Sequence, residues 1–263
     1  MLLVEFWNFL SDPSTAQAFW RGSWITFYLT GVSGFLGLFM GLVAALAKIS
    51  RLPLPRWLAT FYIWFMRGTP LLVQIFLVAF GWPGLPLSFG LRLSDLSPFW
   101  RGVFKIEPFN AAVIALSFNV GAYNAEVIRA GILSVARGQV EAARSLGMSP
   151  LQAMRYVILP QAVPVMVPPL GNNLIALLKD SSLASVISVF ELAKNTQILN
   201  TQTFRVFWGW LIAATLYLIM TSILEQGLNH LERRSSAYRN PQAAAVASAG
   251  RRTVPMTQPR RQP

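Results

Sequence analysis

A run of 26 residues without a charged side chain lies between Arg21 and Lys48. A helix that crosses the hydrocarbon core of a bilayer needs about 20 consecutive apolar residues. The run therefore predicts a membrane-spanning helix near residues 24–47. The composition agrees, because 54% of the 263 residues are hydrophobic and 12% are charged, whereas a soluble domain carries about 25% charged residues.

Four more stretches are long and apolar enough to cross a membrane, near residues 57–80, 109–129, 161–178 and 206–227. The second contains Gly68-Thr69-Pro70. Because threonine can cap a helix and proline can open one, we expect that span to bend or restart there. Prolines at 164, 168 and 169 predict a kink in the fourth span. We expect an all-α integral membrane protein with five transmembrane helices in one domain over residues 20–233.

Four segments fall outside these spans. Residues 1–19 are expected to form an outer N-terminal segment, and residues 82–108, rich in Pro, Gly, Trp and Phe, to lie at the outer surface. Residues 183–192 are apolar but too short to cross, which favours a re-entrant or interfacial helix. Residues 234–263 turn to Ala, Ser, Gln, Pro and Arg, the composition of a disordered basic tail.

The distribution of basic residues predicts the orientation, since cytoplasmic flanks carry an excess of Lys and Arg. One side of the five spans holds fourteen: three between residues 48 and 56, four between 129 and 155, and seven after 232. The other side holds six. We therefore expect the N-terminus outside and the C-terminus in the cytoplasm. Without the seven arginines of the tail the bias is only seven to six.

The net charge of +12 does not indicate a nucleic-acid-binding protein, because the basic residues lie between apolar runs and in the tail. That arrangement suits topology signals and anionic lipid. The chain has no cysteine and one histidine, His230. One histidine makes neither a metal site nor a catalytic triad, so we expect no catalytic residue and no bound metal.

Residues 139–160 read as a short helix, a stop and a second helix; we call them the coupling segment. Gly147 suits the left-handed position after a helix. Ser149 and Gln152 have capping-box spacing, and Pro150 suits the first helical position. By the charge count this segment faces the cytoplasm, where a rigid helix pair can dock into a groove on a soluble partner. The alternative is an ordinary helical loop that packs on its own bundle.

The coupling segment resembles the "EAA loop" of ABC-importer permeases. The matching residues are Glu141-Ala142-Ala143, Gly147 and Leu159-Pro160 at the expected spacing, with Val157 where isoleucine is usual. Three further segments resemble one branch of this family, the polar amino-acid permeases of the histidine, glutamine and glutamate type. They are residues 62–74, 121–131 and 178–183. The resemblance covers about residues 20–233. Segment 82–108 is longer than is usual in that family, and the Arg/Pro tail lies outside its pattern.

The resemblance implies the type I ABC-importer permease fold, with a cytoplasmic coupling helix between the third and fourth spans that sits in a cleft of an ATP-hydrolysing subunit. It implies import of polar amino acids through the bacterial cytoplasmic (inner) membrane. The implied partners are ABC ATPase subunits, an extracytoplasmic amino-acid-binding protein and a second permease, as a homodimer or heterodimer. The residues that this implies for coupling are Glu141, Ala142, Ala143, Gly147, Met148, Ser149 and Pro150.

The ATP chemistry is expected on another chain. None of the four lysines follows a glycine, so the chain has no Walker A lysine. We therefore expect no cofactor on this chain, with ATP and Mg²⁺ on the partner subunit. A non-transporting membrane scaffold or an intramembrane enzyme is the alternative, and the enzyme would need a convergent catalytic cluster that the sequence lacks.

Polar residues inside spans are costly in lipid and so invite a functional reading. Those that share helix faces are predicted to line a translocation path or gate: Arg67, Gln74, Asn119, Tyr123, Glu126, Asn172, Lys179 and Asp180. The alternatives are that the amides cross-link helices, that Glu126 marks an interface, and that Lys179 and Asp180 form a structural ion pair. Ser33, Gly37 and Gly41 recur every four residues, which favours close helix packing, within the subunit or against a second permease.

Overall fold

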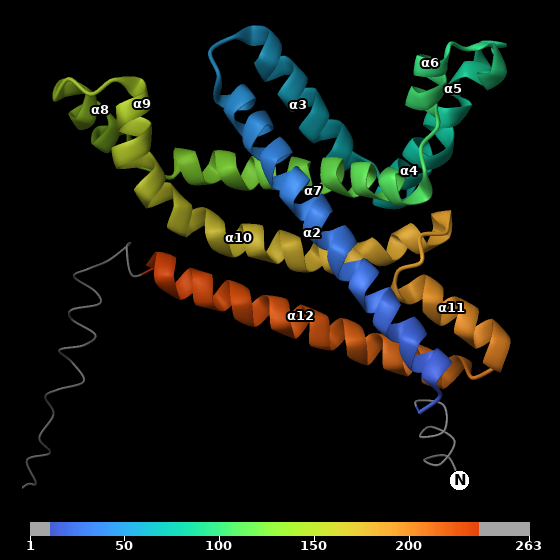
Figure 1. Ribbon diagram of the computed structural model, residues 1–263. Coiled ribbons are helices and arrows are strands. Elements are labelled where there is room, and N and C mark those ends of the chain that lie inside the picture. The colour runs from blue at the N-terminus through green and yellow to red at the C-terminus, as the bar shows by residue number, and fades with distance from the viewer. Residues whose placement is uncertain (1–10, 237–263) are drawn as a thin grey trace, which may run out of the picture.

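A computed structural model of the chain describes residues 11–236 (Figure 1). Helices joined by short turns build this range, and no strand occurs in it. Residues 1–10 and most of the predicted tail lie outside the described residues. The longer helices are α2 (Pro13–Ile49), α3 (Pro53–Gly68), α7 (Pro108–Leu133), α10 (Leu159–Asp180), α11 (Leu192–Thr203) and α12 (Val206–Ser236).

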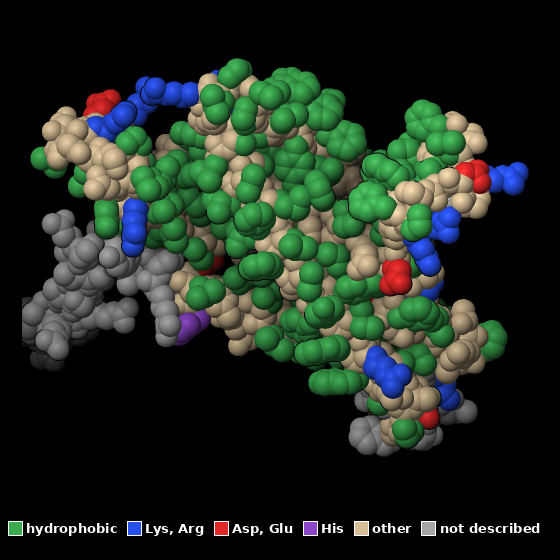
Figure 2. All heavy atoms as spheres, turned by 45° about the horizontal axis from the view of Figure 1, so that its top comes forward, with side chains coloured by type: hydrophobic (Ala, Val, Ile, Leu, Met, Phe, Trp, Pro, Cys, Tyr) green, Lys and Arg blue, Asp and Glu red, His purple; other side chains and the backbone are tan. Residues whose placement is uncertain are grey.

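Five helical segments are long and apolar enough to cross a membrane, which confirms the predicted number of spans. They are Pro13–Ile49, Leu71–Ser88, Pro108–Leu133, Pro150–Ile187 and Val206–Glu232. Hydrophobic side chains cover the middle of the face in Figure 2, while lysine and arginine side chains gather towards its ends. An apolar middle with charged ends is the surface that a bilayer requires.

The first helix is longer than its apolar run. The carboxylate of Asp12 accepts the N–H of Thr15 at 3.1 Å and Pro13 takes the first helical position, so α2 begins eleven residues before Trp24 and runs unbroken for 37 residues. At 1.5 Å per residue this is about 55 Å, well beyond the hydrocarbon core. Residues 13–19, expected to belong to an outer segment, are the first turns of α2.

The predicted second span, residues 57–80, is broken where the sequence predicts it, so that the continuous apolar helical segment begins only at Leu71. Helix α3 ends at Gly68, Thr69 is its C-cap in an extended conformation, and the next helix α4 (Leu71–Phe76) begins after Pro70. The two helices leave the break in different directions (Figure 1). Helix α4 then continues through the π turn η1 (Leu77–Gly81) into α5 (Trp82–Ser88).

Two π turns occur among the described residues, and each precedes a proline. Turn η1 is followed by Trp82 and Pro83, and turn η3 (Met154–Ile158) by Leu159 and Pro160. In each case the residue before the proline donates its N–H five residues back, from Trp82 to Leu77 and from Leu159 to Met154. A proline ring collides with the carbonyl four residues before it, and a widened turn moves that carbonyl away.

Residues 82–108, expected to be a surface segment, form a helical hairpin. Helix α5 leads through the 3-10 turn η2 (Leu93–Asp95) to α6 (Pro98–Phe104). The indole N–H of Trp82 donates to the Val103 carbonyl at 3.0 Å, and the Trp82 and Phe104 rings stack with centroids 5.2 Å apart. Aromatic contacts between the two short helices therefore give this segment its own structure.

Residues 183–192, expected to form one short re-entrant or interfacial helix, do not do so. They contain the end of the 3-10 turn η4 (Ser181–Ile187), the left-handed residue Ser188 with φ +65°, and the start of α11. The left-handed residue turns the chain, and Glu191 caps the new helix by accepting the N–H groups of Ala193 and Lys194 at 2.9 and 2.8 Å.

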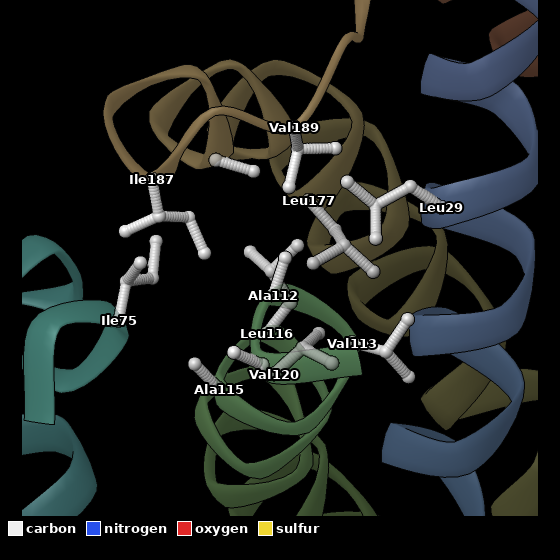
Figure 3. Close-up of a cluster of buried hydrophobic side chains, with 12 residues drawn as sticks. Leu29, Ile75, Ala112, Val113, Ala115, Leu116, Val120, Leu177, Ile187 and Val189 are labelled. Carbon is white, nitrogen blue, oxygen red and sulfur yellow. The ribbon is translucent and has the colours of Figure 1, made fainter. Parts of the chain in front are cut away.

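Helices α2 and α7 cross closely through small residues. A Cβ added at Gly37 would lie 2.3 Å from the Val120 side chain, and one at Gly41 would lie 2.7 Å from that of Asn124. The predicted small-residue stripe thus packs within the subunit. The core cluster of Figure 3 lies around α7, with Leu29 from α2, Ile75 from α4, Leu116 from α7, Leu177 from α10 and Ile187 from η4.

The spans arrange the connecting segments into two groups. The α2–α3 turn, the short helices α8 and α9, and the end of α12 lie towards one end of the bundle (Figure 1). The start of α2, the α5–α6 hairpin and α11 lie towards the other end. A chain that crosses the membrane five times must begin and end on opposite sides, as the start of α2 and the end of α12 do here.

Candidate functional site

The coupling segment folds as a helix, a glycine turn and a second helix. Helix α8 (Arg137–Ser145) ends in a turn in which the N–H of Gly147 donates to the Arg144 carbonyl at 3.0 Å and the N–H of Met148 to the Ala143 carbonyl at 3.2 Å. This pair of bonds is a Schellman ending, which needs a residue with positive φ. Gly147 has φ +81°, so the predicted left-handed glycine is confirmed.

The second helix starts with the predicted capping box. The Ser149 hydroxyl accepts the N–H of Gln152 at 3.3 Å, and the Gln152 side chain accepts the N–H of Ser149 at 2.8 Å. Pro150 is the first residue of α9 (Pro150–Ala153). Helix α9 continues through η3 into α10 without a loop. A displacement of the turn at Gly147 can therefore pass along one continuous helical path into the fourth span.

The tip of the coupling segment exposes apolar side chains. Ala143 is buried inside the segment, and Met148 is half-buried. The other predicted coupling residues are exposed: Glu141, Ala142, Gly147, Ser149 and Pro150. Beside them Leu146 is 80% and Leu151 77% exposed. No part of the described chain covers these two leucine side chains.

A polar cavity of about 400 Å³ lies between α7, α10 and the broken second span. Polar groups reach it from all three elements: Thr69 from the break, Asn119 and Tyr123 from α7, and Asn173 and Asp180 from α10. Pro70, Leu71, Val120, Ala176, Leu177 and Leu183 complete its lining. A cavity with convergent hydrogen-bonding groups between transmembrane helices can hold a small polar solute.

The structure brings five of the eight predicted path residues to the cavity or to its wall. Asn119, Tyr123 and Asp180 line it. The Arg67 guanidinium lies over the Tyr123 ring, 5.3 Å from its centroid. Gln74 is buried behind the wall, where its amide oxygen accepts a hydrogen bond from the Asn119 amide at 3.0 Å.

The other three predicted path residues lie elsewhere. Glu126 is paired with Lys48 of α2 and with Arg129 at 2.9 Å, so it joins the first and third spans. Asn172 and Lys179 are exposed and do not line the cavity. Lys179 and Asp180 form no ion pair with each other in the part of the chain that the structure describes.

Two cavity residues, Asn173 and Thr69, were missed as path residues by the sequence interpretation, as was Asn124, to which Asn173 is hydrogen-bonded. The amide of Asn173 donates to the Asn124 side-chain oxygen at 2.9 Å, which ties α10 to α7. Asn173, Ala176 and Asp180 of α10 line the cavity, whereas the sequence interpretation placed Asn172 and Lys179 on the path beside Asp180. Both sets have helical spacing, and only the contact with α7 distinguishes them.

Residues 11–236 contain no group of three or more His, Cys, Asp or Glu side chains able to hold a metal ion. The polar groups gathered at the cavity are amides, hydroxyls and one carboxyl, which suit binding of a polar solute by hydrogen bonds.

Comparison with known proteins identifies the kind of membrane protein. Residues 37–237 match the family described as "Binding-protein-dependent transport system inner membrane component". The L-cystine transport system permease protein TcyB of Bacillus subtilis is 38% identical, over 84% of this chain and 90% of the relative. The glutamine transport system permease protein GlnP of Escherichia coli is 39% identical, over 80% of this chain and 88% of the relative.

Solved structures agree with the fold. A chain from a crystal structure of an amino acid ABC transporter with histidines superposes with a TM-score of 0.74 and 41% identity, over 86% of this chain and 98% of that chain. A chain of the MetNI methionine ABC transporter in an inward-facing conformation gives a TM-score of 0.64 at 20% identity, over 85% of this chain and 99% of that chain. The five spans, the confirmed turn at Gly147 and these matches together establish that this chain belongs to the family of binding-protein-dependent transport system inner membrane components, the multi-pass permeases of ABC importers.

Proposed function

We propose that this permease imports polar amino acids, driven by ATP hydrolysis on a partner subunit. Relatives that it covers at 80% or more of their length carry the names of glutamine and L-cystine permeases, and a relative in Corynebacterium glutamicum is named as an arginine permease. The cavity at the α3–α4 break supports this substrate class, because amide, hydroxyl and carboxyl groups complement an amino acid's ammonium and carboxylate groups.

The structure of the coupling segment supports this proposal most strongly. It is rigid, because a Schellman turn and a capping box satisfy its backbone. It exposes Leu146 and Leu151, and it runs directly into α10, which lines the polar cavity. In the proposed mechanism this segment sits in a cleft of the ATPase, so that closure of two ATPase subunits moves α10 and opens the route.

The complete transporter would contain two permeases, identical or homologous, with the translocation path between them. A binding protein would deliver the amino acid from outside. The coupling segment lies at the same end as the α2–α3 turn (Figure 1), and both carry basic residues. This supports an N-terminus outside and the coupling segment in the cytoplasm. Glu141, Ala142, Ala143, Gly147, Met148, Ser149 and Pro150 would form the contact with the ATPase.

The test measures uptake and ATP hydrolysis together in vesicles that contain the permease, its ATPase and its binding protein. Glutamine, cystine and arginine are offered in turn. Gly147→Ala places a side chain at φ +81°, and Glu141→Ala removes the exposed acid of α8. Both should lower uptake more than ATP hydrolysis. Gly138→Ala is the control, because Gly138 has open space around it and no positive φ.

Uptake at the unsubstituted rate in both variants would remove the coupling assignment. No ATP-dependent uptake of any of the three amino acids by the unsubstituted complex would count against the substrate class. Failure of the ATPase to co-purify with the permease would instead favour a membrane scaffold without transport.

A further inference from the structure

The break between α3 and α4 creates a backbone problem inside the membrane domain. In an uninterrupted helix the carbonyl of Met66 would accept the N–H of residue 70, four positions on. Residue 70 is proline, which has no N–H. An unpaired carbonyl is costly where lipid replaces water. Pro70 therefore leaves the Met66 carbonyl in need of another donor.

The side chain of Gln74 supplies that donor. Its amide nitrogen lies 2.8 Å from the Met66 carbonyl oxygen, 2.8 Å from the Thr69 hydroxyl and 3.1 Å from the Thr69 carbonyl. The side chain is buried, with 3% of the residue exposed. One amide group thus takes the place of the missing backbone N–H and holds both sides of the break together.

Asn119 connects this arrangement to the third span. Its amide nitrogen donates to the Gln74 amide oxygen at 3.0 Å and lies 3.4 Å from the Met66 carbonyl oxygen. No other donor to that Gln74 oxygen occurs among the described residues. We call Gln74 and Asn119 the amide pair. The amide pair fixes α4 to α7 at the point where the second span is interrupted.

The same asparagine lines the polar cavity, as do Thr69, Pro70 and Leu71 of the break. The break is therefore part of the cavity wall. The two N–H groups of Asn119 are directed at the Gln74 amide oxygen and the Met66 carbonyl oxygen. A carboxylate that enters the cavity and accepts a hydrogen bond from Asn119 has to displace one of these oxygens, and displacing the Gln74 oxygen breaks the bond that joins the amide pair. Loss of that bond leaves a buried amide oxygen unpaired, which weakens the fixed geometry of the break.

We propose that Gln74 and Asn119 are positioning residues that make the angle of the α3–α4 break depend on whether the polar cavity is occupied. This inference rests on the proposed transport function and deepens it. The break is a hinge of the route, and Asn119 is the group through which an amino-acid carboxylate acts on it. Gln74 acts through Asn119 and the Met66 carbonyl.

The first test concerns the chemistry of the break and needs no transport. The permease–ATPase complex is purified, and its thermal midpoint is measured for Gln74→Leu with Pro70 intact and in the Pro70→Ala background. Pro70→Ala restores the N–H that the Met66 carbonyl lacks. Gln74→Leu should therefore lower the midpoint strongly beside Pro70 and much less in the P70A background. Equal losses in the two backgrounds would overturn the assignment of Gln74.

The second test follows the break during transport. The chain has no cysteine, so Leu71→Cys gives one label site at the cavity wall. Maleimide labelling is compared with and without ATP and binding protein loaded with glutamine, cystine or arginine. The labelling rate should depend on the loaded binding protein in the otherwise unsubstituted chain and should lose that dependence with Asn119→Ala. Two results would overturn the proposed hinge. One is a labelling rate that does not change with the loaded binding protein in the otherwise unsubstituted chain, and the other is a labelling rate that still changes with it after Asn119→Ala.

The third readout separates positioning from plain loss of folded protein. Gln74→Leu and Asn119→Ala should raise the ATP hydrolysed per amino acid imported by about tenfold, whereas misfolding lowers both activities in proportion. Gln197→Leu, an exposed glutamine of α11, is the matched control. An unchanged ratio in both variants contradicts the proposal. If the unsubstituted complex shows no uptake, the proposed function is wrong. The role of Gln74 at the break is then decided by the comparison of Gln74→Leu with and without Pro70.

Discussion

The hydroxyl of Tyr217 on α12 donates a hydrogen bond to the carboxylate of Glu191, the N-cap of α11, at 2.7 Å. Glu191 has no exposed surface. Besides capping α11, its carboxylate lies 3.5 Å from the Thr26 hydroxyl of α2. One buried acid thus joins the first span, α11 and the last span, and no cation pairs with it among the described residues.

Burial raises the pKa of Glu191 above its ordinary value of 4.5, against the lowering effect of the hydrogen bonds that it accepts. A carboxyl group with a raised pKa in the folded state stabilises the fold below its unfolded pKa, and that stabilisation is lost as the pH rises through the folded pKa. We expect the thermal midpoint of the unsubstituted protein, relative to Glu191→Gln, to fall as the pH rises from about 4.5. Midpoint curves that stay parallel would contradict this.

Removal of the Tyr217 hydroxyl tests the same contact at fixed pH. Tyr217→Phe keeps the ring but takes away a donor to a buried carboxylate, which should destabilise the fold by about 1–3 kcal/mol. Tyr156→Phe is the matched control, because Tyr156 is 63% exposed and its ring only lies under the Arg155 guanidinium. Differential scanning fluorimetry of the purified complex compares the two. Equal midpoints for both variants would show that the Tyr217–Glu191 bond adds no stability.

The close crossing of α2 and α7 predicts different effects on stability for two similar substitutions. A Cβ at Gly37 meets the Val120 side chain at 2.3 Å, while Gly31 on the same helix has open space around it. Gly37→Ala should destabilise the protein by about 1–3 kcal/mol through overpacking. Gly31→Ala should be neutral or stabilising by up to about 1 kcal/mol, because alanine is the better helix former. The check is the thermal midpoint, and a loss of stability in both variants would argue against the crossing.

The ion-pair cluster at Glu126 predicts coupling between α2 and α7. Lys48 and Arg129 both bond the same carboxylate, and the three side chains are 20–33% exposed. In a double-mutant cycle, Glu126→Gln and Lys48→Met should show a coupling free energy of about 1 kcal/mol. Lys105→Met replaces Lys48→Met in a control cycle, since the exposed Lys105 forms no ion pair in residues 11–236. Additive effects in the first cycle would show that the cluster does not stabilise the crossing.

Local chemistry made the coupling segment predictable. Gly147, Ser149 and Gln152 act on backbone groups within a few residues of themselves, so their spacing alone determines the turn and the cap. The number of spans followed in the same way from uncharged length. The break at Pro70 was predictable because proline lacks an N–H, whatever surrounds it.

The face of α10 and the roles of single polar residues depend on contacts that the sequence does not contain. A helix that is apolar around most of its surface gives little indication of its rotation, so Asn172 was chosen where Asn173 meets α7. The sequence placed Gln74 on the path and gave no sign of its contact with the Met66 carbonyl. That contact depends on the angle of the break, which is a tertiary feature. Glu191 gave no signal, since its burial requires α2 and α12 to meet at α11.

A cross-link from the tip of the coupling segment tests whether this segment faces the cytoplasm and contacts the ATPase. A single cysteine in place of Leu146, which is 80% exposed in a chain without cysteine, is treated in vesicles with a membrane-impermeant maleimide, and then with a bifunctional reagent in the complete complex. The account predicts labelling only from the cytoplasmic side and an adduct with the ATPase whose yield changes with ATP. Labelling from outside intact cells, with no ATPase adduct, would contradict it.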